Sequence, residues 1–196
     1  MTAAGRPREF DLDDAIERAL DLFWRRGYEG TSISELTEAL GITRASLYAA
    51  FGSKEGLFRR VMERYEARAG AYRVAAGQAP TSLEAVRLLL NGPVALHGDS
   101  QNPPGCLGVQ GALACGVDSE AIRSDLSSRR QRGEAAIRNR LQRAAEEGDL
   151  AAGKNPADLA RYLSALIYGM AVLAADGASR EDLQGVADIA FERWSR

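Results

Sequence analysis

The sequence has few of the residues that mark secreted, metal-binding or disulfide-linked proteins. Its 196 residues include two cysteines, Cys106 and Cys115, and one histidine, His97. Two cysteines are too few for a disulfide framework, and their spacing matches no zinc-finger pattern. The N-terminal residues MTAAGRPREF contain no apolar segment of the kind that a signal peptide requires. We therefore expect a cytoplasmic protein with no metal site and no cofactor.

Long apolar runs and an excess of one charge are also missing. Arg, Asp, Glu or Gly interrupts every apolar stretch before it reaches the roughly 18 to 20 residues of a membrane span, so we expect no membrane contact. The 25 basic and 27 acidic residues give a net charge of -2, which on its face argues against a nucleic-acid partner. With 45% hydrophobic residues, the chain has the composition of one globular domain or two small ones.

Apolar residues recur at intervals of three and four along the whole chain, which predicts an all-α protein of about nine helices. Capping residues mark the ends: Ser32 and Glu35, for example, have the spacing of a capping box. The predicted helices lie between Asp11 and Gly27, between Ser32 and Gly41, from Arg44 to Phe51, from Ser53 through Tyr65, and near 82–96, 107–114, 119–147, 156–175 and 180–194. Residues 98–105 form the long loop.

Residues 31–58 have the pattern of a helix-turn-helix. Two short predicted helices flank Gly41, which supplies the backbone freedom that a tight turn needs. In this arrangement the second helix has an exposed face that can enter a DNA major groove. The alternative is an ordinary corner between two helices, with Tyr48 in the core.

Several side chains of this segment are suited to DNA. Arg44 can pair with a guanine edge or a phosphate, and nearby hydroxyls can bond phosphates or bases. Lys54 follows a predicted cap at a helix N-terminus, where backbone N–H groups favour a phosphate. The candidate DNA-contacting residues are Thr31, Ser32, Thr43, Arg44, Ala45, Ser46, Tyr48 and Lys54, with Arg6 from the segment before the first helix.

Three motifs in residues 10–62 resemble the DNA-binding domain of TetR/AcrR-type transcriptional repressors. They are F-x-x-x-G-Y-x-x-T-S at 23–32, I-x-x-L-x-x-A-L-G-I-T at 33–43, and S-L-Y-x-x-F-x-S-K-E-x-L-F at 46–58. The resemblance implies a recognition helix at 44–51, phosphate contacts by Tyr48 and Lys54, and a homodimer on a palindromic operator of double-stranded DNA. Ala49 and Ala50 depart from the bulkier residues of many relatives, so the operator sequence cannot be transferred.

The resemblance also implies two domains. Residues 1–53 would form the helix-turn-helix domain, with a basic arm at 1–9, and residues 54–196 would form a helical domain for effector binding and dimerisation. The arginines of the arm could equally be incidental residues of a frayed terminus.

Apolar stripes on the last two predicted helices are the candidates for the dimer seam, where Ala165 and Gly169 would allow close approach. The same stripes could instead form the core of one protomer. The candidate dimer residues are Leu163, Ile167, Met170, Leu183, Val186 and Ala190.

Cys106 is the candidate sensor residue. It follows a flexible loop at a predicted helix start, a position that favours a thiolate. The segment Gly105-Cys106-Leu107 resembles that of relatives which sense electrophiles or oxidants through a cysteine. The alternative is a small buried hydrophobe, which we expect for Cys115, placed in the middle of the same predicted helix.

The effector itself is not identified by the sequence. His97 lacks the partners of a metal or catalytic histidine, so we expect it in a loop or pocket. Aromatic and apolar residues of the later helices are candidates for lining an apolar effector pocket or for packing in the core. They are Tyr72, Tyr162, Tyr168, Met170 and Phe191.

Charge is unevenly distributed along the chain. Residues 9–40 hold three basic and nine acidic side chains, whereas residues 41–60 hold four basic and one acidic. The arginines between Arg123 and Arg143 are spread around their helix, so we expect a solvated face there. The near-neutral total thus conceals a basic recognition segment.

Taken together, these features predict a DNA-binding transcriptional repressor that a small molecule, electrophile or oxidant releases from its operator. It would not be an enzyme, because no general base stands at a recognisable spacing from Cys106 or His97. The alternatives are a helical protein-interaction module without DNA binding and a Cys-dependent helical enzyme.

Overall fold

The computed structural model describes residues 10–113 and 115–194, and these form ten α-helices, a short 3-10 helix and no strand. The predicted all-α fold is therefore confirmed. Arg6 and the arm at 1–9 lie outside the described residues. The helices are α1 (Leu12–Arg26), α2 (Ile33–Leu40), α3 (Arg44–Phe51), α4 (Lys54–Ala69), α5 (Ala71–Gln78), α6 (Ser82–His97), α7 (Leu107–Gln110), α8 (Glu120–Glu146), α9 (Pro156–Ala175) and α10 (Arg180–Trp194), with η1 at Val117–Ser119.

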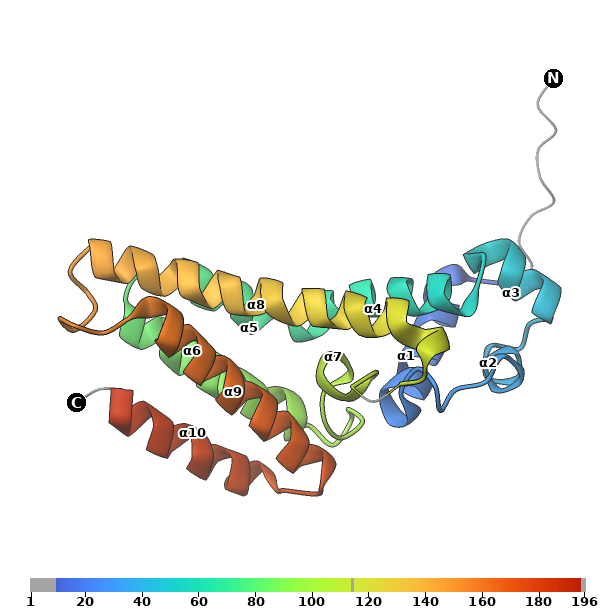
Figure 1. The fold of residues 1–196 in the computed structure, drawn as a ribbon. Helices are drawn as coiled ribbons and strands as arrows, with labels where there is room; N and C mark the ends of the chain where they lie inside the picture. The colour runs from blue at the N-terminus through green and yellow to red at the C-terminus, as the bar shows by residue number, and fades with distance from the viewer. Residues whose placement is uncertain (1–9, 114, 195–196) are drawn as a thin grey trace.

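The molecule is elongated, with α1 to α3 at one end and α9 and α10 at the other (Figure 1). The long helix α8 runs along most of its length and passes close to α4, α5 and α7 (Figure 1).

Caps set the helix boundaries where the sequence predicts them. The Asp11 carboxylate accepts hydrogen bonds from the backbone N–H groups of Asp13 and Asp14. At α2 both halves of the capping box are present, because Ser32 Oγ accepts from Glu35 N–H and the Glu35 carboxylate accepts from Ser32 N–H. Gly41 ends α2 in the left-handed conformation, at φ 68°. The predicted bounds of α3, α9 and α10 are confirmed.

Two helix predictions are wrong. A break at Gly70 separates α4 from α5, so there are ten α-helices instead of nine. α7 ends at Gln110, because the Gly111 carbonyl accepts a hydrogen bond from Tyr28 N–H at 2.9 Å and the chain turns towards α1. Cys115 consequently lies beyond the helix and is half-buried, not in the core of a helix as predicted.

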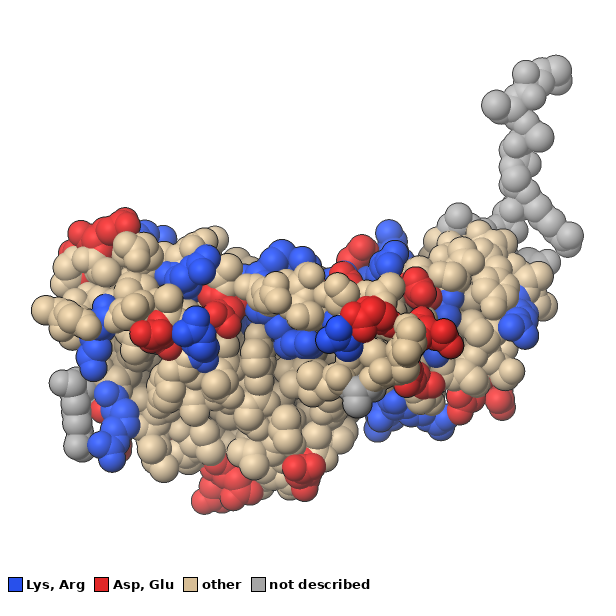
Figure 2. Space-filling view, viewed as in Figure 1, with Lys and Arg blue, Asp and Glu red and all other residues tan. Residues whose placement is uncertain are grey.

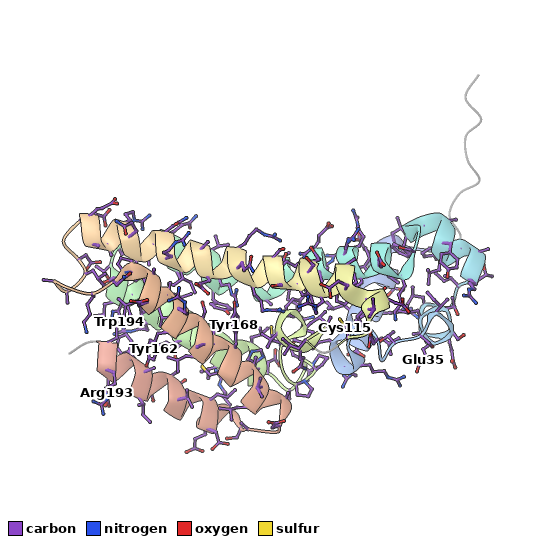
Figure 3. All side chains as sticks on the ribbon, viewed as in Figure 1. Glu35, Cys115, Tyr162, Tyr168, Arg193 and Trp194 are labelled. Atoms are coloured by element: carbon purple, nitrogen blue, oxygen red, sulfur yellow. The ribbon has the colours of Figure 1, made fainter. Side chains whose placement is uncertain are left out.

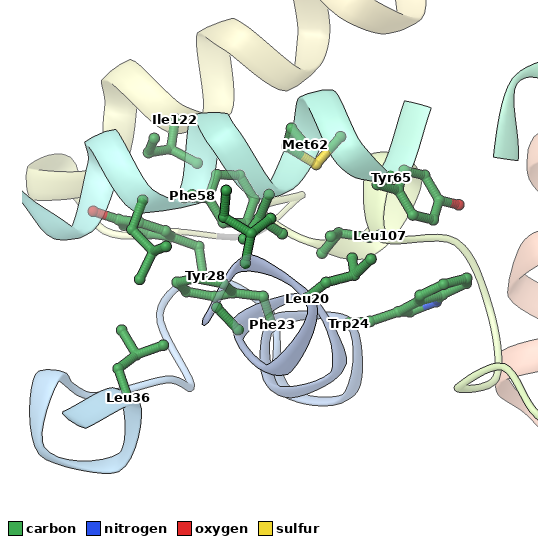
Figure 4. Close-up of a cluster of buried hydrophobic side chains, with 14 of the residues drawn as sticks. Leu20, Phe23, Trp24, Tyr28, Leu36, Phe58, Met62, Tyr65, Leu107 and Ile122 are labelled. Atoms are coloured by element: carbon green, nitrogen blue, oxygen red, sulfur yellow. The ribbon is translucent and has the colours of Figure 1, made fainter. Parts of the chain in front are cut away.

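The first hydrophobic core holds α1 to α4 together with α7 and the start of α8 (Figure 4). Its buried aromatic rings contact one another: Phe58 meets Phe23 edge-on with 5.0 Å between ring centroids, and Trp24 meets Tyr65 edge-on at 4.8 Å. α4 packs inside this core, so the core extends across the predicted domain boundary between residues 53 and 54. That boundary stays a prediction about function.

The second core joins α5, α6, α8, α9 and α10, and its fully buried members are aliphatic. It contains five of the six candidate dimer residues, so their assignment to a dimer seam is wrong and the alternative of an intramolecular core holds. The sixth, Val186, is half-buried against it. These five are Leu163, Ile167, Met170, Leu183 and Ala190.

By length and composition alone α9 is apolar enough to cross a membrane, a test that the core helix of a folded protein also passes. In this fold α9 packs against α6 and α8. Its opposite side leaves Tyr162, Val172 and Leu173 each about 45% exposed.

Candidate nucleic-acid interface and ligand cavity

Helix α3 is anchored on one side and exposed on the other. Leu47 is completely buried in the first core, whereas Arg44, Ala45 and Tyr48 are exposed. The Arg44 guanidinium lies 5.8 Å from the centroid of the Tyr48 ring. This contact holds a positive charge and a hydroxyl side by side on the outer face of a short helix, as a groove-reading helix requires.

Thr43 and Ser46 support the start of α3. Thr43 Oγ1 accepts a hydrogen bond from Ser46 N–H at 3.1 Å and lies 2.9 Å from Ser46 Oγ. Both hydroxyls keep further bonding capacity, and Thr43 is exposed. Their use as DNA contacts stays a prediction.

Lys54 and Ser32 lie at the N-termini of the helices on either side of α3. The Lys54 ammonium lies 4.2 Å from the centroid of the Tyr28 ring, and burial lowers the pKa of Lys54 below its usual value. Ser32 is exposed while its hydroxyl caps α2. Both remain available to a phosphate.

Thr31 is the one described candidate that cannot contact DNA through its side chain. It is completely buried, and its hydroxyl donates a hydrogen bond to the Gly27 carbonyl at 2.8 Å. The prediction for Thr31 is wrong, because this hydroxyl satisfies a carbonyl at the end of α1.

A cavity of about 290 Å³ lies where the two cores meet. Its wall includes Met62 and Tyr65 from the first core and Ile167 from the second. All four sequence candidates for effector contact line it: Tyr72, His97, Cys106 and Tyr168. A ligand here would touch both halves of the molecule.

The remaining pocket candidates lie elsewhere. Met170 is buried in the second core and Phe191 packs against that core, with the Arg87 guanidinium 4.8 Å from its ring centroid. Tyr162 lines a separate cavity at the far end with Arg193 and Trp194 (Figure 3). For Met170 and Phe191 the alternative of core packing therefore holds, and Tyr162 lines a different cavity from Tyr168.

Cys106 has a defined partner in the cavity wall. The Tyr65 hydroxyl donates a hydrogen bond to Cys106 Sγ at 2.9 Å. Burial, and then the neighbouring sulfur, raise the pKa of Tyr65 well above its usual value, so the phenol keeps its proton at neutral pH. Tyr65 can therefore donate to the sulfur in its thiol or its thiolate form.

His97 is uncharged at neutral pH. Burial is the main cause that lowers its pKa to about 4. Its Nδ1 atom is buried and has no hydrogen-bond partner among the described residues. The ring is thus a neutral polar group in the cavity wall, and of the two predicted places for His97, a loop or a pocket, the structure has the second.

The arginines of α8 were missed as functional residues. Arg129, Arg130 and Arg132 line the cavity, and the side chain of Arg140 is only 3% exposed. The prediction of a solvated arginine face is wrong for Arg129, Arg130 and Arg140, because each reaches a partner on another segment. Arg129 pairs with Glu66 of α4, Arg130 donates to the Gly108 carbonyl, and Arg140 donates to the Ala79 carbonyl. Figure 2 shows basic side chains along α8 near the middle of the molecule.

Comparisons with known proteins agree with this geometry. The family model described as "Bacterial regulatory proteins, tetR family" matches residues 15–61. The transcriptional repressor ComR of Escherichia coli (strain K12) is 34% identical over 192 residues, covering 97% of this chain and 91% of ComR. The chain belongs to the TetR family of bacterial regulatory proteins.

A solved TetR-family structure has nearly the same fold. It is a cysteine mutant of the regulator CifR in complex with 26-bp operator DNA, and it is 43% identical with a TM-score of 0.92, covering 97% of this chain and 100% of CifR. Another repressor of E. coli K12, BdcR, is 52% identical over 61 residues, which are 31% of either chain.

Proposed function

We propose that this TetR-family chain is a homodimeric transcriptional repressor that binds a palindromic operator through α3 and leaves it when an effector occupies the cavity. The observation that carries the proposal is the outer face of α3. It bears Arg44 and Tyr48 in contact, while Leu47 fixes the helix in the core. A relative with nearly the same fold was solved on operator DNA.

DNA binding is tested by a gel shift with the DNA upstream of the protein's own gene. We expect saturable binding that resists competitor DNA and weakens with salt. Arg44→Ala should cost about 1 to 3 kcal/mol per half-site and relax sequence preference, whereas Tyr48→Phe should weaken all sequences alike. Arg138→Ala is the matched control, because Arg138 is exposed on α8 and lies outside α3 and outside the proposed dimer seam. Weak, nonspecific binding by the wild type would refute the proposal.

Dimerisation is assigned to the exposed apolar side of α9 and α10 in place of the buried stripes. Tyr162, Val172 and Leu173 on α9 and Ile189 on α10 are 44% to 65% exposed. A Cβ added to Gly169 or Gly185 would meet no atom within 4 Å, so the protomer leaves room for a partner helix there. This supports the four-helix seam that two such protomers would form.

The signal would pass from the cavity to α3 through the segment 105–111. The Gly105 carbonyl accepts a hydrogen bond from Trp24 Nε1 at 2.9 Å, and the Gly111 carbonyl accepts from Tyr28 N–H. Both donors belong to the core that holds α3. A ligand that displaces this segment would alter the separation of the two recognition helices, which must match successive major grooves about 34 to 36 Å apart.

Cys106 is the candidate for sensing an electrophile or oxidant. Hydrogen peroxide would oxidise the thiolate to a sulfenic acid and be reduced to water. We expect peroxide to release wild-type protein and Cys115→Ser from DNA, but not Cys106→Ser. If Cys106→Ser left the DNA at the same peroxide concentration as the wild type, Cys106 would be a packing residue and not a sensor.

We further infer that the chain has no catalytic activity and works in the cytoplasm, where it meets chromosomal DNA. The relatives named above are regulators, which supports the first point. Within residues 10–113 and 115–194 no cluster of His, Cys, Asp or Glu could hold a metal ion, so no step needs to be assigned to one.

A further inference from the structure

The wall of the cavity between the two cores contains more arginines than carboxylates. Four arginines and one carboxylate, Glu66, line it. Glu66 pairs with Arg129 at 2.6 Å, and Arg129 also pairs with Asp125 at 2.9 Å. The other three arginines are Arg73, Arg130 and Arg132, and the described residues offer them no carboxylate within ion-pair distance.

Arg73 is the most confined of these three. It is half-buried, its Nε donates to the Tyr72 hydroxyl at 3.0 Å, and its terminal nitrogen Nη1 lies against Gly133 of α8, 2.7 Å from where a Cβ would stand. Its bonded partner is therefore neutral. Removing a guanidinium from water without an opposite charge is costly, and a ligand anion would supply that charge.

Arg130 and Arg132 differ from Arg73. Arg130 spends one N–H on the Gly108 carbonyl at 2.9 Å, and Arg132 is exposed at the rim. These two arginines make the electrostatic potential of the cavity more positive. They would therefore attract an anion towards Arg73 without binding it in a fixed geometry.

The rest of the wall is apolar. Met62, Leu96, Val109 and Ile167 face the same cavity, whose 290 Å³ is at the lower end of the range for small-molecule sites. The buried Nδ1 of His97 offers one more unused polar atom. A fully polar anion such as phosphate would leave the apolar wall uncovered.

We infer that this cavity binds a small organic carboxylate, with its carboxylate on Arg73 and its hydrocarbon part against Met62 and Ile167. A guanidinium and a carboxylate match in a planar, two-bond geometry. That this ligand is also the effector rests on the proposed function, whereas the binding itself does not.

Calorimetry on the full chain without DNA tests the inference, with hexanoate, hexanamide and inorganic phosphate as probes at pH 7.5. Hexanamide has the size of hexanoate without its charge. We expect hexanoate to bind at least tenfold more tightly than either other probe. Arg73→Met should remove that tenfold preference and Arg73→Lys should keep part of it. Arg138→Met is the matched control, because Arg138 is exposed on α8 and does not line the cavity.

Several outcomes would overturn the inference. Equal binding of hexanoate and hexanamide to the wild type would do so without any variant, as would the absence of binding by all three probes. Phosphate binding as tight as that of hexanoate would assign the site to another ligand.

A gel shift on the same preparations separates this inference from the proposed function. Hexanoate binding by a protein that does not recognise its upstream DNA would leave the carboxylate site standing and refute the repressor. Specific DNA binding with no preference for hexanoate would refute the site and leave the repressor standing.

Discussion

The first core is built around aromatic rings, whereas the fully buried members of the second core are aliphatic. In the first, Phe23, Tyr28 and Phe58 contact one another, with centroid distances of 5.0 to 6.2 Å. In the second, the aromatic residues, among them Tyr72 and Tyr168, stand at the margin. Edge-to-face rings fix relative orientation, which suits a core that has to hold α3 in register.

The margin of the second core has a different use. Two of its partly buried aromatic residues, Tyr72 and Tyr168, carry hydroxyl groups and line the cavity. The first core thus supports α3 at one end of the molecule, whereas the margin of the second core borders the cavity in the middle. The predictions below test whether this division is real.

Removal of the Phe58 ring should have the largest effect. Phe58→Ala deletes a fully buried side chain and two edge-on contacts, so we expect the free energy of unfolding to fall by about 3 to 5 kcal/mol. Guanidinium unfolding followed by fluorescence at Trp24, in a Trp194→Phe background, measures it. Leu89→Ala in the second core, followed at Trp194, is the comparison. If the Phe58→Ala transition followed by Trp24 fluorescence coincided with its transition followed by circular dichroism, the two cores would unfold as one unit.

A charge on the exposed side of α9 should break the dimer and spare both cores. Leu173→Glu places a carboxylate in the proposed seam, and we expect the dimer dissociation constant to rise at least a hundredfold, or about 2.7 kcal/mol. Analytical ultracentrifugation measures it, with circular dichroism to check the fold. Ala136→Glu, on the exposed part of α8, is the control. An unchanged dimer would move the interface to another surface.

The depressed pKa of His97 should make stability depend on pH. Between about pH 6.5 and about 4 the unfolded chain binds a proton at His97 that the folded chain does not. Stability should therefore fall as the pH falls through this window, by about 2 kcal/mol once partial exposure is allowed for. Unfolding at pH 7.0 and 4.5 measures it. His97→Gln should show a smaller loss, and an identical loss would assign the slope to carboxylates.

Loss of the α2 cap should have the smallest effect. Ser32→Ala removes the hydroxyl that accepts from Glu35 N–H, so we expect a loss of about 1 kcal/mol in stability. Thermal unfolding measures it. Ser34→Ala, on the exposed side of the same helix, is the control. Equal effects of the two changes would mean that the capping box contributes nothing measurable.

The helix-turn-helix was predictable because capping residues in the sequence mark the ends of its helices. Thr43 and Gly52 fix α3 to the residue, and Ser32 with Glu35 fixes the start of α2. The break at Gly70 carries no such signal, because its backbone stays in the helical region and no side chain caps α5. Turns that depend on a tertiary contact, as at Gly111, are likewise invisible in a local pattern.

The cavity was predictable in part. Tyr72, His97, Cys106 and Tyr168 stood out by residue type, but the arginines of α8 did not, since a long charged helix usually faces water. The dimer stripes failed for a related reason. A period of three and four residues marks a buried face without saying which molecule buries it. Met170 is 1% exposed in the core of the protomer, whereas Leu173, three residues further along the same helix, is 44% exposed.

The contact between Gly27 and Gly111 limits how halves of TetR-family proteins could be recombined. A Cβ at Gly27 would stand 3.2 Å from the Gly111 carbonyl oxygen, at a φ of +70°, so this crossing admits little besides two glycines. A chimera that joined the α1 to α3 region of another regulator to this ligand-binding half would need a glycine at position 27. The chimera would also have to keep residues 105–111 of this chain together with its cavity, because this peptide contacts both the cavity and α1.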